Sequence, residues 1–233
     1  MTNQAKVLTI ILDGWGLNKP YEGNAIHLAN TPTFDYLWEN QPRAKLDCSG
    51  LAVGLPEGQM GTSEVNHMII GAGRVIYQDL VKLNLAIKDG SFFDNSEFIT
   101  AFDHVKKHDS NLHLMGLYSP GGVHSHSEHF KALVTAAKKH GLNQKIYLHL
   151  ITDGRDTKPK SGLGYIKDLQ EFLNNEGVGE IASVSGRYYA MDRDHNWDRT
   201  DQYFKMITQS ETEPVFDDAI QAIQASYDQK ITD

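Results

Sequence analysis

The apolar positions from residue 77 onward follow two alternating periods, which predicts helices and strands in turn. Short, continuous apolar runs predict buried strands over 112–117, 146–151 and 181–184. Apolar residues three or four positions apart predict the helices around them. Because helices and strands alternate, we predict a parallel α/β sheet. The helical positions are Leu80, Leu83 and Ile87, then Phe98, Phe102 and Val105, then Phe130, Leu133, Val134 and Ala137, then Ile166, Leu169, Phe172 and Leu173, then Trp197, Phe204 and Ile207, and finally Phe216, Ile220 and Ile223.

Glycines and capping residues indicate where these helices begin and end. Gly90, Gly141 and Gly177 each follow a helical pattern and are expected to stop it. Ser125 and Glu128 have the spacing of a capping box, which predicts that Ser125 caps the third helix.

The first 76 residues have a less regular pattern and are predicted to form a separate domain. The branched apolar run Val7–Leu12 predicts a strand buried on both faces of a sheet, and a short strand is expected around residues 44–46. We therefore place a domain border near residue 76, which gives domains over 1–76 and 77–233.

Ser63 lies where a Pro- and Gly-rich loop, residues 54–58, leads into a short apolar helix. A serine at or near such a helix start can cap it by accepting a hydrogen bond from a backbone N–H. It can also act as a nucleophile whose phosphorylated form is stabilised by the positive end of the helix dipole. The local pattern alone favours the capping role.

Composition and charge restrict the classes of partner. The chain has 40% hydrophobic and 22% charged residues, as ordinary globular proteins do, and a net charge of −8. This acidic balance argues against nucleic acid or an anionic membrane as the main partner, but a local arginine cluster can still bind a small anion. Cys48 is the only cysteine, which fits a reducing cytosol, and the apolar run 7–12 is too short for a signal peptide or a membrane span. We expect a cytoplasmic monomer that acts on a small molecule.

Polar residues follow each predicted strand, at the ends where open α/β sheets bind their ligands. His124 follows the first strand, Arg155 and Asp156 follow the second, and Arg187 and Arg193 follow the third. Because parallel strands end at one edge of a sheet, we expect these side chains around a single crevice. Arginine binds phosphate and carboxylate groups through its planar fork of donors, so the pattern favours an anion site.

Asp13 and a histidine cluster are the candidates for metal binding. Asp13 follows the run Val7–Leu12, a position that suits a metal-binding or catalytic carboxylate as well as a turn aspartate. His124, His126 and His129 are spaced closely enough to suggest a transition-metal site. No thiolate lies nearby and His129 is expected to face outward on its helix, so we disfavour that site.

Six stretches of the chain, taken in order, resemble the cofactor-independent (2,3-bisphosphoglycerate-independent) phosphoglycerate mutases, a family of the alkaline-phosphatase superfamily. Each motif alone is modest, but six in the same order along nearly the whole chain are specific. The stretches are residues 11–16, 54–65, 70–74, 121–126, 153–157 and 184–194.

The resemblance implies a fold, an activity and roles for the candidate residues. It implies that residues 1–76 are the N-terminal piece of an alkaline-phosphatase-like domain and that residues 77–233 are a phosphotransferase domain, without its C-terminal end. It further implies a glycolytic isomerase that interconverts 2-phosphoglycerate and 3-phosphoglycerate through a phosphoserine on Ser63. Asp13 and Ser63 would be ligands of two divalent ions, usually manganese. The implied substrate-binding residues are His124, Arg155, Asp156, Arg187 and Arg193.

The chain also departs from this family. Thr62 stands where the family usually has Asn, Asn66 where it has Gly, and Pro120 where it has Asp. Family members are about twice as long, and the missing part would carry the remaining metal ligands. The alternative reading is therefore an inactive fragment that at most binds phosphoglycerate. A phosphatase or another phosphotransferase of the superfamily is a third reading, which would not require the histidine and arginine set.

Overall fold

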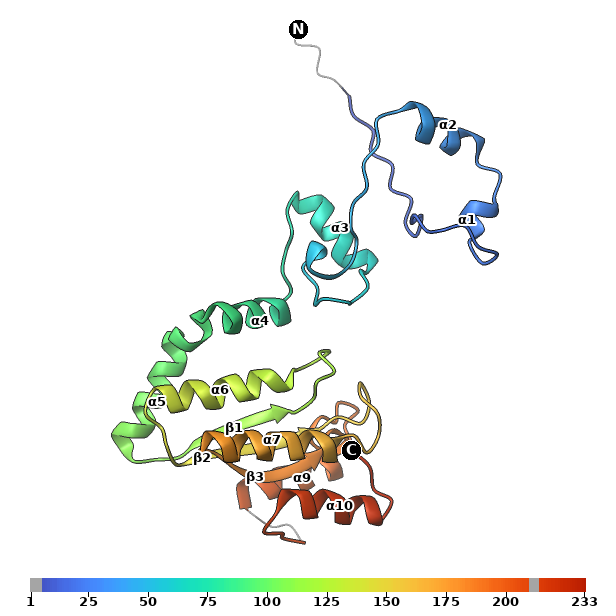
Figure 1. Ribbon diagram of the computed structural model, residues 1–233. Helices are drawn as coiled ribbons and strands as arrows, with labels where there is room; N and C mark the ends of the chain where they lie inside the picture. Colours follow the sequence, from blue (N-terminus) through green and yellow to red (C-terminus); the bar gives the residue numbers. More distant parts are fainter. Residues whose placement is uncertain (1–5, 210–213) are drawn as a thin grey trace. The chain divides into compact units, whose positions relative to one another are not determined.

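The computed structural model describes residues 6–209 and 214–233, and the chain divides into two compact units, Met1–Tyr77 and Gln78–Asp233 (Figure 1). Each unit has its own secondary structure and is described separately below. In the described part of the chain, no helix is both long enough and apolar enough to cross a membrane.

The unit Gln78–Asp233 contains a parallel sheet of three strands in the order β1-β2-β3. The strands are β1 (Leu112–Leu117), β2 (Ile146–Thr152) and β3 (Glu180–Gly186). Both neighbouring pairs are parallel, so all three strands end at the same edge of the sheet. The predicted α/β class and its parallel strands are confirmed.

Helices surround this sheet where the apolar spacing predicts them. Gly90 ends α4 with a φ of 91°, and Gly177 ends α7 with a φ of 67°. These left-handed angles are the reason for glycine at both positions, since a side chain there would be strained. The elements are α4 (Asp79–Asp89), η2 (Ser91–Asp94), α5 (Ser96–His108), α6 (Ser127–Lys139), α7 (Gly162–Glu176), α8 (Arg187–Ala190), α9 (Trp197–Gln209) and α10 (Ala219–Asp228).

The start of α6 differs from the prediction. His126, and not Ser125, is the N-cap, and its Nδ1 accepts a 3.3 Å hydrogen bond from the backbone N–H of Glu128. The backbone N–H of Ser127 donates to the carbonyl oxygen of Ser119 at 2.8 Å. This bond to the loop after β1 holds the first helical residue in place, so the extended chain turns into the helix only after His126.

The core lies between the sheet and the helices packed on it. Val134 of α6, Leu148 of β2 and Leu169 of α7 are fully buried, and α10 contributes Ile223 and Tyr227 to the same cluster. Figure 1 shows α6 and α7 running alongside the strands. This packing fixes the strand ends from which the polar loops emerge.

The unit Met1–Tyr77 contains α1 (Ala25–Leu28), α2 (Pro32–Asn40), η1 (Gly50–Val53) and α3 (Ser63–Ala72). The two strands predicted here, Val7–Leu12 and residues 44–46, are wrong: neither segment is a strand, and the side chains of Val7 and Leu8 are 86% and 83% exposed. A strand needs a neighbour to accept its backbone hydrogen bonds, and no described residue of this unit supplies one. The apolar run Val7–Leu12 therefore forms no strand and stays exposed.

Candidate functional site

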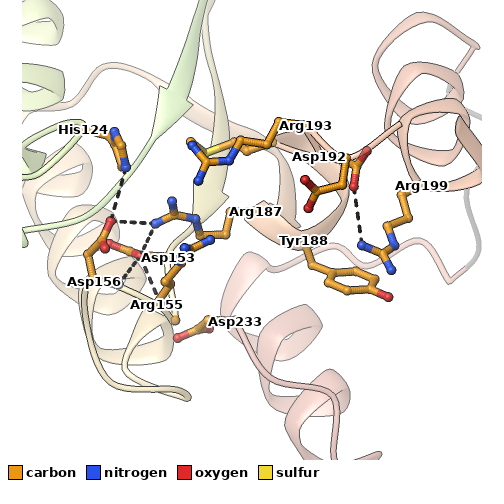
Figure 2. Close-up of a pocket in the computed structure, with 13 residues that line it drawn as sticks. His124, Asp153, Arg155, Asp156, Arg187, Tyr188, Asp192, Arg193, Arg199 and Asp233 are labelled. Carbon is orange, nitrogen blue, oxygen red and sulfur yellow. Dashed lines mark hydrogen bonds and ion pairs between the residues drawn. The ribbon is translucent and has the colours of Figure 1, made fainter. Parts of the chain in front are cut away.

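A cavity of about 440 Å³ lies where β1, β2 and β3 end (Figure 2). The five residues predicted to bind the substrate, which follow three different strands, all line it. The parallel order of the strands brings these loops together. The lining residues are His124, Asp153, Gly154, Arg155, Asp156, Arg187, Tyr188, Met191, Asp192, Arg193, Asp194, Arg199 and Asp233.

The turn after β2 is built on the buried carboxylate of Asp153. Its Oδ1 accepts hydrogen bonds from the backbone N–H groups of Arg155 at 3.2 Å and Asp156 at 2.9 Å. Gly154 has a φ of 61°, and a side chain there would also collide with the backbone oxygen of Asp233 at 2.6 Å. The turn therefore has one compact shape, which directs Arg155 and Asp156 to the cavity.

Arg187 is the first residue of α8 and links two carboxylates of this turn. Its Nη1 donates to Oδ1 of Asp153 and to Oδ2 of Asp156, both at 2.8 Å. Burial by itself would lower the pKa of Arg187, but the hydrogen bonds to Asp156 and Asp153 raise it above its ordinary value, so the group stays cationic. In the described part of the chain its Nε and Nη2 have no protein partner, which leaves donors for a ligand.

Asp156 also faces His124, which joins the two loops. The Nε2 of His124 lies 3.7 Å from Oδ2 of Asp156, the same oxygen that accepts from Arg187. The His124 side chain is 48% exposed and that of Asp156 is 20% exposed. His124 therefore remains open to the cavity while Asp156 is largely occupied by the protein.

The cationic groups at the cavity differ in how far protein carboxylates neutralise them. Among residues 6–209 and 214–233, the guanidinium groups of Arg155 and Arg193 have no hydrogen bond or ion pair. Figure 2 shows the guanidinium of Arg193 directed toward the side of the cavity that holds His124 and Arg187. Arg155 and Arg193 thus carry the charge that remains available for an anion.

The cavity also holds a further group of residues that was not predicted from the sequence, formed by Arg199, Tyr188 and Asp192. Arg199 of α9 stacks over the Tyr188 ring at 3.8 Å, and its Nη1 lies 3.4 Å from Oδ1 of Asp192. Arg199 lies within a helix and does not follow a strand, so the rule that located the other arginines could not find it. Asp153 was missed as a separate site residue because its neighbours Arg155 and Asp156 carry the more conspicuous chemistry.

Ser63 is the first residue of α3, next to the cap. Thr62 is the N-cap, and its Oγ1 accepts a 3.3 Å hydrogen bond from the N–H of Val65. The Ser63 hydroxyl is therefore not used for capping. It donates to Oδ2 of Asp13 at 2.7 Å and lies 3.1 Å from Nδ1 of His67.

Asn66, which stands where the resembled family usually has Gly, has a structural role in the same helix. The side-chain amide of Asn66 donates a 3.3 Å hydrogen bond to the carbonyl oxygen of Cys48. This bond ties α3 to the loop before η1, and Thr62 caps the same helix. Both side chains thus support the helix start that carries Ser63.

The donors near Ser63 fit only part of the expected two-metal site. Asp13 and Ser63 offer oxygen ligands, which hard divalent ions prefer. However, the described residues contain no group of three or more His, Cys, Asp or Glu that could hold a metal ion. Two oxygen groups are too few for a pair of ions, so this part of the chain does not complete such a site.

Comparison with known proteins identifies similar sequences and a similar structure. The family described as "BPG-independent PGAM N-terminus" matches residues 83–233. Two proteins named 2,3-bisphosphoglycerate-independent phosphoglycerate mutase are similar. The one from Onion yellows phytoplasma is 53% identical over 100% of this chain and 44% of its own length, and the one from Clostridium perfringens (strain 13 / Type A) is 49% identical over 97% of this chain and 44% of its own length.

A solved structure is also similar. Its title describes Leishmania mexicana phosphoglycerate mutase at low cobalt concentration. The TM-score is 0.66 with 32% sequence identity, over 89% of this chain and 39% of that chain. In each comparison, this chain spans less than half the length of the protein that it matches.

Proposed function

Because the chain belongs to the family of BPG-independent phosphoglycerate mutases, we propose that it forms part of an isomerase that interconverts 2-phosphoglycerate and 3-phosphoglycerate. The observation that carries the proposal is the cavity at the strand ends, where Arg155 and Arg193 have no carboxylate partner among the described residues. A phosphoglycerate bears a phosphate and a carboxylate, which are the two groups that arginine binds best.

The residues around the cavity have separate roles in this proposal. Arg155 and Arg193 supply the positive charge that attracts the ligand. Arg187 offers its remaining Nε and Nη2 donors as a fixed fork. His124 is half-exposed and donates or accepts a hydrogen bond at the glycerate hydroxyl, while Asp156 holds both His124 and Arg187 in place.

Ser63 is the proposed nucleophile. The Ser63 oxygen forms a bond to phosphorus while the bond between phosphorus and the glycerate oxygen breaks. The glycerate oxygen takes up the proton that the Ser63 hydroxyl loses. The other glycerate hydroxyl then attacks the phosphoserine and returns the proton to Ser63, so the reaction is an isomerisation. Asp13 accepts the hydrogen bond of the Ser63 hydroxyl at 2.7 Å and orients its oxygen.

A divalent ion, Mn²⁺, belongs to the proposal but is not part of these steps. Such an ion would neutralise phosphoryl oxygens and lower the pKa of the serine hydroxyl when bound. Asp13 and Ser63 would be two of its ligands, and the others would come from outside residues 1–233.

Calorimetric titration with 3-phosphoglycerate tests the cavity. We expect the 233-residue chain to bind it, and Arg155→Ala and Arg193→Ala each to weaken binding about tenfold, as the loss of a charged hydrogen bond does. Lys82→Ala removes one positive charge from the exposed surface of α4, outside the cavity, and serves as the matched control. Absence of binding by the unaltered chain, or equal affinity in all variants, would contradict the proposal.

A mutase assay on the same chain distinguishes an enzyme that is active by itself from a part that only binds the substrate. Turnover by the 233-residue chain would show that it is an enzyme by itself. Binding without turnover would support the alternative that it is a phosphoglycerate-binding part of a longer enzyme, consistent with the incomplete donor set near Ser63.

A further inference from the structure

Asp153 accepts more hydrogen bonds than any other carboxylate that lines the cavity, and its side chain is only 2% exposed. Its Oδ1 accepts from Arg187 and from two backbone N–H groups of its own turn. Its Oδ2 accepts a 2.6 Å hydrogen bond from the Ser119 hydroxyl. One buried carboxylate thus joins the loop after β1, the turn after β2 and the helix start after β3.

Ser119 fixes the second oxygen of this carboxylate. Ser119 is 1% exposed, and its Oγ accepts a 3.0 Å hydrogen bond from the N–H of Gly121. Because an ionised carboxylate can only accept, the hydroxyl donates its proton to Asp153 while it accepts from Gly121. Gly121 lies directly over the pair: a side chain at this position would meet Ser119 Oγ at 3.1 Å and Asp153 Oδ2 at 3.5 Å.

Electrostatics alone would not place a carboxylate here. Asp153 lies within 2.8 Å of Arg187 and cancels part of the positive charge that a phosphoglycerate would meet. Burial of the carboxylate also carries a desolvation cost, which its four hydrogen bonds offset. The charge of Asp153 opposes anion binding, so any favourable contribution of Asp153 to binding comes from the segments that it holds in place.

We infer that Asp153, supported by Ser119, is a positioning residue that sets the guanidinium of Arg187 and the turn 153–156 for anion binding. The inference rests on the proposed function for the ligand, whereas the placement of Arg187 can be measured without any ligand. Asp153 itself need not touch the ligand.

The substitution Asp153→Asn separates charge from position, because asparagine has nearly the same shape. Removing a negative charge beside Arg187 would strengthen binding of 3-phosphoglycerate if only charge mattered. We expect binding to weaken about tenfold, since a neutral amide replaces the anionic acceptor of Arg187 and its nitrogen cannot accept from Ser119. Unchanged or tighter binding by a folded variant would overturn the inference. Asp168→Asn, an equal charge change on the exposed surface of α7, should leave binding unchanged.

A double-mutant cycle tests whether Asp153 acts through Arg187. If it does, the loss of binding caused by Asp153→Ala should be several-fold smaller in the Arg187→Ala background than in the unaltered chain, and the part that remains reflects the turn 153–156. Fully additive losses would mean that Asp153 does not act through Arg187, which would overturn the inference.

Nitrogen-detected NMR of the Arg187 guanidinium gives a readout without ligand. In the unaltered chain, hindered rotation should give separate Nη signals, which should average in Asp153→Asn and, more weakly, in Ser119→Ala. Ser119→Ala keeps the carboxylate and is the milder variant if Asp153→Asn does not fold. Unaltered Arg187 signals in the folded variants would overturn the inference. If the unaltered chain does not bind 3-phosphoglycerate, the proposed function fails, and these spectra still decide the role of Asp153.

Discussion

The hydroxyl of Ser63 donates a 2.7 Å hydrogen bond to the carboxylate of Asp13, although 50 positions separate the two residues in the sequence. Thr62 caps α3, so the serine hydroxyl is not needed for the helix. The two residues singled out for chemistry in the first unit are thus in direct contact.

We predict that Ser63→Ala abolishes the mutase activity of the proposed enzyme, because alanine has no hydroxyl to take up the phosphoryl group. Conversion of 3-phosphoglycerate, followed in a coupled assay, measures this. The control Ser49→Ala removes a hydroxyl of the same unit that makes no capping hydrogen bond. Retained turnover in Ser63→Ala would exclude Ser63 as the nucleophile.

We predict opposite effects for two glycine substitutions in the first unit. A side chain on Gly61 would come within 1.8 Å of the carbonyl oxygen of Cys48, so Gly61→Ala should lower the free energy of unfolding by about 2 kcal/mol. Gly71 lies within α3 with no atom near its added side chain, so Gly71→Ala should raise it by about 1 kcal/mol. Urea denaturation distinguishes them, and equal effects would contradict the close approach at Gly61.

We predict that Asp153 contributes to the acid sensitivity of the second unit. Burial by itself raises the pKa of this carboxyl, but hydrogen bonds from Ser119, Asp156, Arg187 and Arg155 hold the pKa below its ordinary value. A carboxyl whose pKa is lower in the folded state stabilises the fold above its unfolded pKa of about 3.9, and this contribution disappears as the pH falls through the folded pKa.

Asp153→Asn should therefore be less stable than the unaltered chain at pH 7, with a smaller further loss below about pH 4. Urea denaturation of both proteins across this pH range measures the difference. If the free energy of unfolding changed with pH in the same way for both proteins, Asp153 would not contribute to the loss of stability in acid.

We predict that the leucines of the two units differ in their effect on stability. Leu169 is 0% exposed within the core between α7 and the sheet, so Leu169→Ala should cost about 2–5 kcal/mol. Leu46 is 88% exposed, so Leu46→Ala in the same 233-residue chain should change the free energy of unfolding by less than about 0.5 kcal/mol. Comparable losses in the two variants would contradict the exposure of Leu46.

Local pattern was sufficient where the chain determines its own conformation. The spacing of Phe98, Phe102 and Val105 predicted α5, and Gly90 and Gly177 predicted two helix ends. These features depend on helical periodicity and on the sterics of positive φ, which act within a few residues. The rule that parallel strands end together likewise predicted that loops after three strands would meet.

Local pattern failed where a partner distant in sequence decides the outcome. Val7–Leu12 has the composition of a buried strand, but the described residues of its unit include no neighbouring strand. The cap of α6 is His126 because Ser119 holds Ser127. Propensity describes what a segment can form, whereas pairing and burial determine what it does form.

By itself, therefore, the sequence determined the α/β class, the parallel strands and the set of residues at their ends. Only the tertiary structure decided that Arg187 is held by Asp153 and Asp156 while Arg155 and Arg193 have no carboxylate partner among the described residues. It also decided that Thr62 caps α3 and that Ser63 contacts Asp13. The physical reason is that the charge and hydrogen-bonding state of a side chain depend on atoms within about 3 Å, and the fold brings those atoms together from segments far apart in the chain.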